Sequence, residues 1–115
     1  MDAFDPEAAA RAVADSLRAL GSPERAAGEK GYLKSDLEFF GVTVPDIRRT
    51  VQAAARSHQG LDREAVLAWA AALWREPVHE RRMAAVELLT LAVRRLPAAD
   101  ADRLRALRAA AGPVA

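Results

Sequence analysis

The sequence contains no cysteine and few aromatic residues, namely two tryptophans, one tyrosine and three phenylalanines among 115 residues. The absence of cysteine excludes a disulfide framework, a thiolate zinc site and a cysteine nucleophile. Valine, isoleucine and threonine are also scarce, whereas about a quarter of the residues are alanine. This composition favours helix over sheet. The length fits one domain, over residues 1–115.

Long hydrophobic runs are absent as well. The longest uncharged apolar run covers residues 65–74, which is too short to cross a bilayer. The first residues include Asp2, Asp5 and Glu7, and this acidic start does not fit a signal peptide. We therefore expect a soluble, cytoplasmic protein with no membrane partner.

The charges nearly balance. Seventeen Lys and Arg stand against sixteen Asp and Glu, for a formal net charge of +1. Such a balance neither requires nor excludes a nucleic-acid partner. Lys30 and Lys34 are the only lysines, so the basic residues are almost all arginine.

Six prolines are spread along the chain and accompany helix-start signals. Proline is tolerated at the first helical position, where its missing N–H costs nothing, and Asp, Ser or Thr before it can cap the helix. The pairs Asp5-Pro6 and Ser22-Pro23 show this pattern. Reading such starts together with glycine stops, we expect an all-α fold of six helices, over residues 6–20, 23–34, 44–58, 63–74, 77–96 and 97–111.

The apolar residues of these segments recur at helical spacing and define the expected core. The expected inward residues of the first helix are Ala10, Val13, Ala14, Leu17 and Leu20, and those of the fifth are Ala85, Leu88, Leu89, Ala92 and Leu96. Glu80, Glu87 and Arg94 are expected to point outward. The fourth helix is apolar on nearly all sides and must lie between neighbours. Antiparallel pairs recurring every 35–40 residues suggest a two-helix solenoid repeat.

Few residues carry a signature of chemistry. His58 and His79 are isolated, with no carboxylate at ligand spacing, and we expect both at the surface and no metal site. Gly28 and Gly31 lie inside a helical segment and follow no strand, so they do not form a phosphate loop. The serines lack a nearby base and orienting partner. The sequence therefore predicts no cofactor and no catalytic residue.

Two features exceed this background. The first is the aromatic and basic segment at residues 30–35, followed by Arg48, Arg49 and Arg56. It reads either as a phosphate-docking surface or as an ordinary solvated face. The second is the pair Trp69 and Trp74, which we expect in the core rather than in a platform for stacking bases.

Two blocks of sequence resemble a known family. Residues 29–48, EKGYLKSDLEFFGVTVPDIR, resemble the N-terminal signature of the bacterial DNA alkylation repair family, the AlkD-type glycosylases built from HEAT-like helical repeats. Residues 73–89, LWREPVHERRMAAVELL, resemble that family's next repeat boundary. With their spacing intact, the two blocks cover most of residues 25–96.

The resemblance implies a right-handed α-solenoid whose concave basic face holds double-stranded DNA. It also implies release of positively charged N3- or N7-alkylated purines by cleavage of the glycosidic bond. Such a base is already activated as a leaving group, and a carboxylate near the sugar can stabilise the developing oxocarbenium ion.

The sequence departs from the family in one respect. The family's tryptophan–aspartate motif, which carries the catalytic carboxylate, lies in a later repeat, and no tryptophan follows Trp74 here. We therefore expect a truncated solenoid that corresponds to the first half of the family's domain. The resemblance transfers Tyr32 as a cleft aromatic and Lys34, Arg48 and Arg49 as contacts to the DNA backbone. It transfers no catalytic residue.

A different class of function stays open, that of a non-catalytic scaffold for protein interactions. A solenoid without its terminal repeat exposes an apolar stripe, which in this sequence is expected at Leu104, Leu107 and Ala111. A second copy of the chain or another partner would then cover the last helix.

Overall fold

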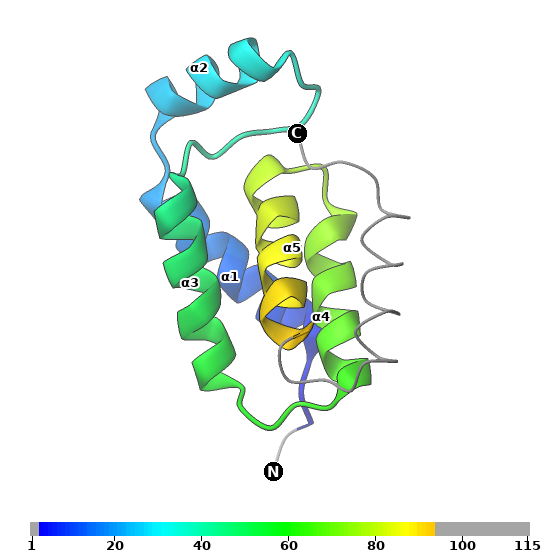
Figure 1. Cartoon of the computed structure of the whole chain (residues 1–115). Helices are drawn as coiled ribbons and strands as arrows, with labels where there is room; N and C mark the ends of the chain where they lie inside the picture. Colours follow the sequence, from blue (N-terminus) through cyan, green and yellow to red (C-terminus); the bar gives the residue numbers. More distant parts are fainter. Residues whose placement is uncertain (1–2, 94–115) are drawn as a thin grey trace.

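A computed structural model describes residues 3–93, which form five helices and, within that range, no strand. Figure 1 shows the order α1 (Pro6–Leu20), α2 (Pro23–Leu33), α3 (Val44–Ser57), α4 (Arg63–Arg75) and α5 (His79–Val93). The all-α class is thus confirmed. The sixth expected helix, with Leu104, Leu107 and Ala111, lies outside the described residues, as do Arg94 and Leu96.

The helices begin where side chains cap them. Asp5, Ser22, Thr43 and Asp62 each accept hydrogen bonds from backbone N–H groups of the first helical turn. These contacts satisfy donors that have no partner inside a helix. Pro77 was expected to begin the fifth helix, but α5 begins at His79. Pro77 and Val78 precede the helix, and Val78 forms a short parallel bridge with Glu38.

Helix α5 lies at the centre of the helical body. It packs against α4, α3 and α1, and α1 also packs against α3 and α4. In Figure 1, α5 runs between α3 and α4 while α1 crosses behind them. Consecutive helices from α3 to α5 alternate in direction, in keeping with the expected antiparallel connections.

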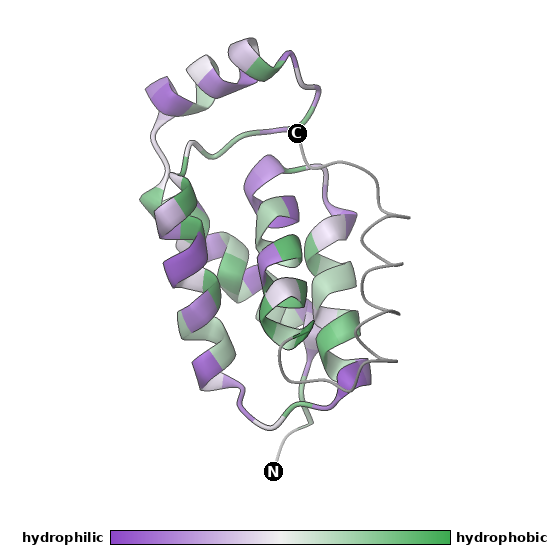
Figure 2. Ribbon diagram, viewed as in Figure 1, coloured by the Kyte–Doolittle hydropathy of each residue, from purple (hydrophilic) through white to green (hydrophobic). Residues whose placement is uncertain are grey.

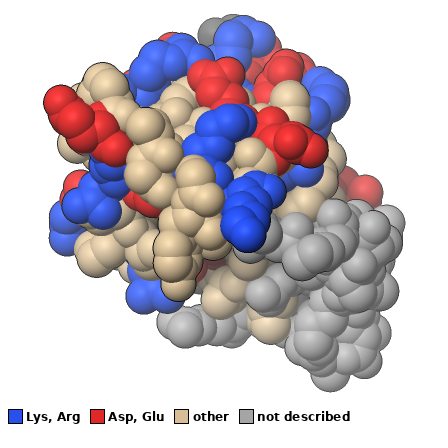
Figure 3. Space-filling view, turned by 90° about the horizontal axis from the view of Figure 1, so that it is seen from above, with Lys and Arg blue, Asp and Glu red and all other residues tan. Residues whose placement is uncertain are grey.

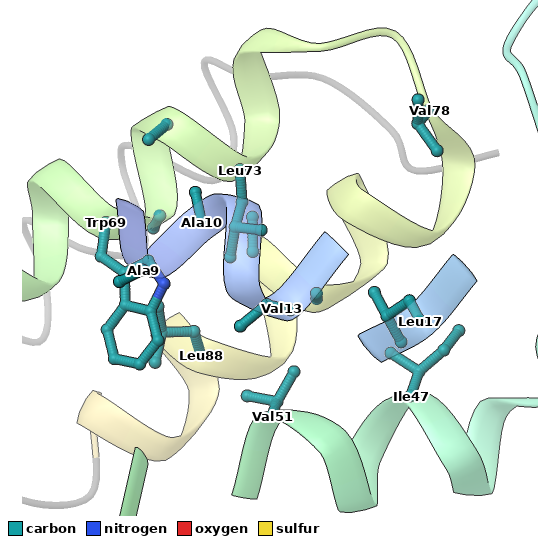
Figure 4. Packing of buried hydrophobic residues seen from close by; sticks show 14 of the residues in the cluster. Ala9, Ala10, Val13, Leu17, Ile47, Val51, Trp69, Leu73, Val78 and Leu88 are labelled. Atoms are coloured by element: carbon teal, nitrogen blue, oxygen red, sulfur yellow. The ribbon is translucent and has the colours of Figure 1, made fainter. Parts of the chain in front are cut away.

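The core forms where these four helices meet. Figure 4 shows Leu17 and Val13 of α1 close to Ile47 and Val51 of α3, with Trp69 of α4 at the other end of the cluster. All five side chains are almost completely buried. Complete burial of one such aliphatic side chain stabilises the fold by about 1.5–3 kcal/mol. The expected inward positions of Val13 and Leu17 and the expected core role of Trp69 are thus confirmed, although Leu20, expected inward, is half exposed.

Helix α2 differs from the others because none of its residues is buried. No closely packed pair of described helices includes it, and Figure 1 shows it across one end of the body. Figure 2 shows hydrophobic residues along α4 and α5, but a mixture of polar and hydrophobic residues on α2. The position of α2 must therefore depend on the segments at its ends.

Two glycines allow those segments to cross. Gly41 has a φ of +81°, and a Cβ atom there would lie 2.1 Å from the carbonyl oxygen of Ser22. A Cβ atom on Gly21 would lie 2.1 Å from the carbonyl oxygen of Phe40. The Ser22 N–H also donates to the Gly41 carbonyl at 3.1 Å. Only glycine permits this close approach of the backbone.

No helix within residues 3–93 combines the length and the apolar character that crossing a membrane requires.

Candidate functional site

Tyr32 and Lys34 lie together at the C-terminal end of α2. The Tyr32 side chain is among the most exposed large side chains, at 87%. Lys34 is the C-cap of α2 and adopts a left-handed conformation with φ of 51°. Its side chain forms no ion pair with any residue in the described range. An exposed ring and an unpaired ammonium group therefore project from one helix end.

Arg48 and Arg49 leave α3 in different directions. The Arg48 Nε atom lies 3.9 Å from a carboxylate oxygen of Glu87 on α5. Arg49 donates to Asp46 of its own helix and lines the groove between α1 and α3. In Figure 1 the length of α2 separates these residues' helix from the end of α2 that carries Tyr32. The four predicted residues thus occupy three places rather than one cluster.

Charges of both signs are mixed on the surface around α2. Figure 3 shows Lys and Arg interspersed with Asp and Glu on this face, with no continuous basic patch. Arg25 and Glu29 pair within α2 at 3.8 Å, and Lys30 donates to the Leu37 carbonyl at 2.7 Å. Exposed pairs of this kind contribute less than about 1 kcal/mol. Arg25 can therefore exchange the Glu29 carboxylate for another anion at little cost.

The two histidines differ in their surroundings, and the expectation for one of them is wrong. His58 is exposed, with its ring edge-on to Phe4 and Trp69. His79 was expected at the surface but is buried and stacks on Phe39, with ring centroids 4.5 Å apart. The bridge segment brings Phe39 over the start of α5 and covers His79. No three potential ligands among residues 3–93 come close enough to hold a metal ion.

The tryptophans follow the prediction of a core role. Trp69 is 2% exposed, and Trp74 is half-buried with the Arg82 guanidinium 4.9 Å from its ring centroid. Packing covers the Trp69 ring, and the Arg82 guanidinium covers one face of the Trp74 ring.

Glu80 was expected to point outward, but its side chain is completely buried. One carboxylate oxygen accepts the Phe40 N–H at 2.8 Å, and the other accepts those of Gly41 at 3.0 Å and Val42 at 3.2 Å. Hydrogen bonds to a charged acceptor are about twice as strong as neutral ones. The prediction from helical spacing was wrong because it took no account of residues 40–42, which cover the side chain.

Arg81, next in the chain, is a second buried charge. Its guanidinium donates to the Ala72 carbonyl at 2.8 Å and the Leu73 carbonyl at 3.2 Å. These carbonyls belong to the last turn of α4, where a helix leaves acceptors without partners. Burial lowers the pKa of the Arg81 guanidinium, although the negative charges of Glu76 and Glu7 oppose the shift. Together, Glu80 and Arg81 tie the start of α5 to two other segments.

Sequence reasoning missed this buried pair because acidic and basic residues in a first helical turn are usually solvated. One signal was available. The apolar residues 39–42 contain backbone N–H groups that need acceptors once they are buried, and a nearby helix with a carboxylate in its first turn can supply them.

Comparison with known proteins identifies one family. A family model described as DNA alkylation repair enzyme matches residues 13–111, a range that contains most of α1 and all of α2 to α5. No curated protein and no solved structure matches the chain.

Proposed function

The chain belongs to the DNA alkylation repair enzyme family, and from this membership we propose that it binds alkylated double-stranded DNA during repair. The match covers nearly the whole chain and is the observation that carries the proposal. The fold expected from the family is a HEAT-like right-handed solenoid over residues 1–115. The alternating directions of α3, α4 and α5 support that architecture.

The proposed contacts are to the sugar-phosphate backbone. Lys34 presents an ammonium group that has no ion-pair partner among residues 3–93, and Tyr32 presents a ring that can lie against a sugar or a base. The side chains of Arg48 and Arg49 are 62% and 70% exposed in their ion pairs. Phosphate oxygens are stronger and more numerous acceptors than one exposed carboxylate, and guanidinium groups bind them with two parallel hydrogen bonds.

The proposed reaction of the family is excision of positively charged N3- or N7-alkylated purines. The described residues are suited to binding more than to this chemistry. Glu80 is the one fully buried carboxylate among residues 3–93, and both of its oxygens are occupied by backbone N–H groups. It cannot approach a sugar to stabilise an oxocarbenium ion. Because the sequence also lacks the family's tryptophan–aspartate motif, we propose that this chain alone does not excise bases.

Binding is tested by fluorescence anisotropy with a labelled duplex that contains N7-methylguanine, across a series of salt concentrations. Three or four phosphate contacts predict a slope of log K against log salt of roughly −3 to −4. The double variant Arg48→Ala, Arg49→Ala is expected to reduce the slope by about 2. Arg11→Ala is the matched control, since Arg11 is an exposed arginine on α1. Equal affinities for the double variant and the wild type would contradict the assignment.

Excision is tested on the same duplex by heating it after incubation, which cleaves the strand at abasic sites. We expect no lesion-dependent cleavage with this chain alone. Turnover that depends on the lesion would show that the chain carries its own chemistry.

A protein-interaction scaffold is the second candidate. Leu20, Leu33 and Val44 are exposed to between 39% and 50%, and such side chains favour burial against a partner. In this proposal a second copy of the chain also covers the apolar stripe expected from the sequence at Leu104, Leu107 and Ala111. Light scattering over a range of concentrations tests this candidate, and a monomer at the highest concentration would count against it.

A further inference from the structure

Helix α2 is held in place mainly by contacts at its ends. It contributes no buried residue to the core. Its first residue follows Ser22, whose N–H donates to the Gly41 carbonyl at 3.1 Å, and Lys30 near its other end reaches the Leu37 carbonyl. Both acceptors belong to residues 37–41, so the position of α2 follows the position of that segment.

The segment is in turn held by the start of α5. The Glu38 backbone pairs with the segment before α5: its N–H donates to the Pro77 carbonyl at 3.0 Å, and its carbonyl accepts the His79 N–H at 2.8 Å. The Glu80 carboxylate then accepts three consecutive backbone N–H groups, of residues 40 to 42. No other side chain in the described range accepts more than two backbone N–H groups. Glu80 thus supplies all the side-chain hydrogen bonds to residues 40–42, beside the backbone bonds of Glu38.

We infer that Glu80 is the positioning residue that holds α2, with Tyr32 and Lys34 at its end, in the orientation used for binding. The part concerning DNA rests on the proposed function, whereas the part concerning α2 does not. Glu80 touches no ligand itself. It acts through its hydrogen bonds to residues 40–42, and through Gly41 to the N-cap of α2.

The test variant is Glu80→Gln, which keeps the side-chain size but replaces one acceptor oxygen with an NH2 donor. At least one of the three backbone N–H groups then faces a donor and loses its partner. The variant also removes one negative charge, which by itself would strengthen binding to DNA. Asp15→Asn is the matched control for charge, because Asp15 is an exposed carboxylate on α1.

The first measurement needs no DNA. Amide hydrogen exchange and ¹⁵N relaxation by NMR are compared between wild type and Glu80→Gln. We expect faster exchange at residues 22 and 40–42 and greater motion in α2, with α4 unchanged. Unchanged exchange and relaxation in these segments would overturn the inference. If Glu80→Gln does not fold, Gly41→Ala breaks the same connection from the other side, because its Cβ would collide with the Ser22 carbonyl.

The second measurement is DNA affinity in a double-mutant cycle. Glu80→Gln is expected to weaken DNA binding by about three- to tenfold, which corresponds to the loss of roughly one phosphate contact near 0.1 M salt. The control variant Asp15→Asn should not weaken binding. In the background Tyr32→Ala, Lys34→Ala, the same change should have no further effect. An equal loss in both backgrounds would overturn the claim that Glu80 acts through α2. If α2 becomes mobile but neither background loses affinity, the positioning role stands and the DNA role of α2 is refuted.

Discussion

Replacing Gly41 by alanine is expected to destabilise the fold far more than the same replacement at Gly60 or Gly28. An alanine at a φ of +81° costs about 1–2 kcal/mol. The added Cβ would also lie 2.1 Å from the Ser22 carbonyl oxygen, so the backbone must move. That movement weakens the hydrogen bonds from Ser22 to Gly41 and from Gly41 to Glu80, which contribute about 1 and 1.5–3 kcal/mol.

The expected loss in the free energy of unfolding is therefore about 3–5 kcal/mol. A domain of this size is stable by about 5–15 kcal/mol in total, so the variant should fold but unfold early. With roughly 3–6 °C per kcal/mol for a chain of this length, the Tm should fall by at least about 9 °C.

Two other glycines serve as matched controls. Gly60 has a nearly identical φ of +83°, but a Cβ there would meet nothing within 4 Å. Gly60→Ala should therefore cost only the conformational strain, about 1–2 kcal/mol. Gly28 lies inside α2 and also has open space around it, so Gly28→Ala should stabilise the protein by up to about 1 kcal/mol. The three variants share the same change in the unfolded chain, and that contribution cancels in their comparison.

The assay is urea unfolding followed by circular dichroism, with thermal unfolding as a second measurement. The difference between Gly41→Ala and Gly60→Ala should be at least about 2 kcal/mol. If the two variants are equally stable within about 0.5 kcal/mol, the crossing of the Ser22 and Gly41 segments is not as tight as described, and the reasoning is refuted.

Two further predictions concern Lys34 and Arg81, whose replacement should change the free energy of unfolding in opposite directions. Lys34→Gly should raise the free energy of unfolding by up to about 1 kcal/mol, because glycine adopts the left-handed conformation of this C-cap without strain. It should also weaken DNA binding, because it removes the ammonium group. Urea unfolding measures the first effect and anisotropy the second, and a variant that lowers both stability and affinity would contradict the assignment. Arg81→Met should lower the free energy of unfolding by about 2–3 kcal/mol, because the buried carbonyls at the end of α4 lose their charged donor. Urea unfolding checks it, with Arg11→Met as the exposed control, and equal stability of the two variants would show that the buried contact contributes nothing.

Helix positions and most of the core could be predicted from the sequence because their causes are local. A capping side chain followed by proline marks a helix start whatever lies elsewhere, and Asp5 and Ser22 act as caps as expected. Helical spacing likewise places Val13 and Leu17 on a single face of α1, and burial follows when any apolar partner is present. The family was also accessible, since its two blocks lie in continuous stretches of sequence.

The candidate site was predictable only in part. The residue types at positions 32, 34, 48 and 49 were read directly, but their spatial relation was not. Consecutive residues on a helix point about 100° apart, so Arg48 meets Glu87 of α5 while Arg49 faces the groove beside α1. The separation between these arginines and the end of α2 could not be predicted, because it depends on how the helices pack.

The sequence by itself determined the helical class, the first four helix starts, most of the apolar faces and membership of a DNA alkylation repair family, because each is encoded in neighbouring residues. Only the tertiary structure decided that His79 and Glu80 are buried and that α2 lies outside the core. Glu80 and the three N–H groups that it accepts are about forty residues apart in the chain. A polar residue at the start of a helix is solvated unless another segment crosses it, and that crossing depends on the packing of the whole chain.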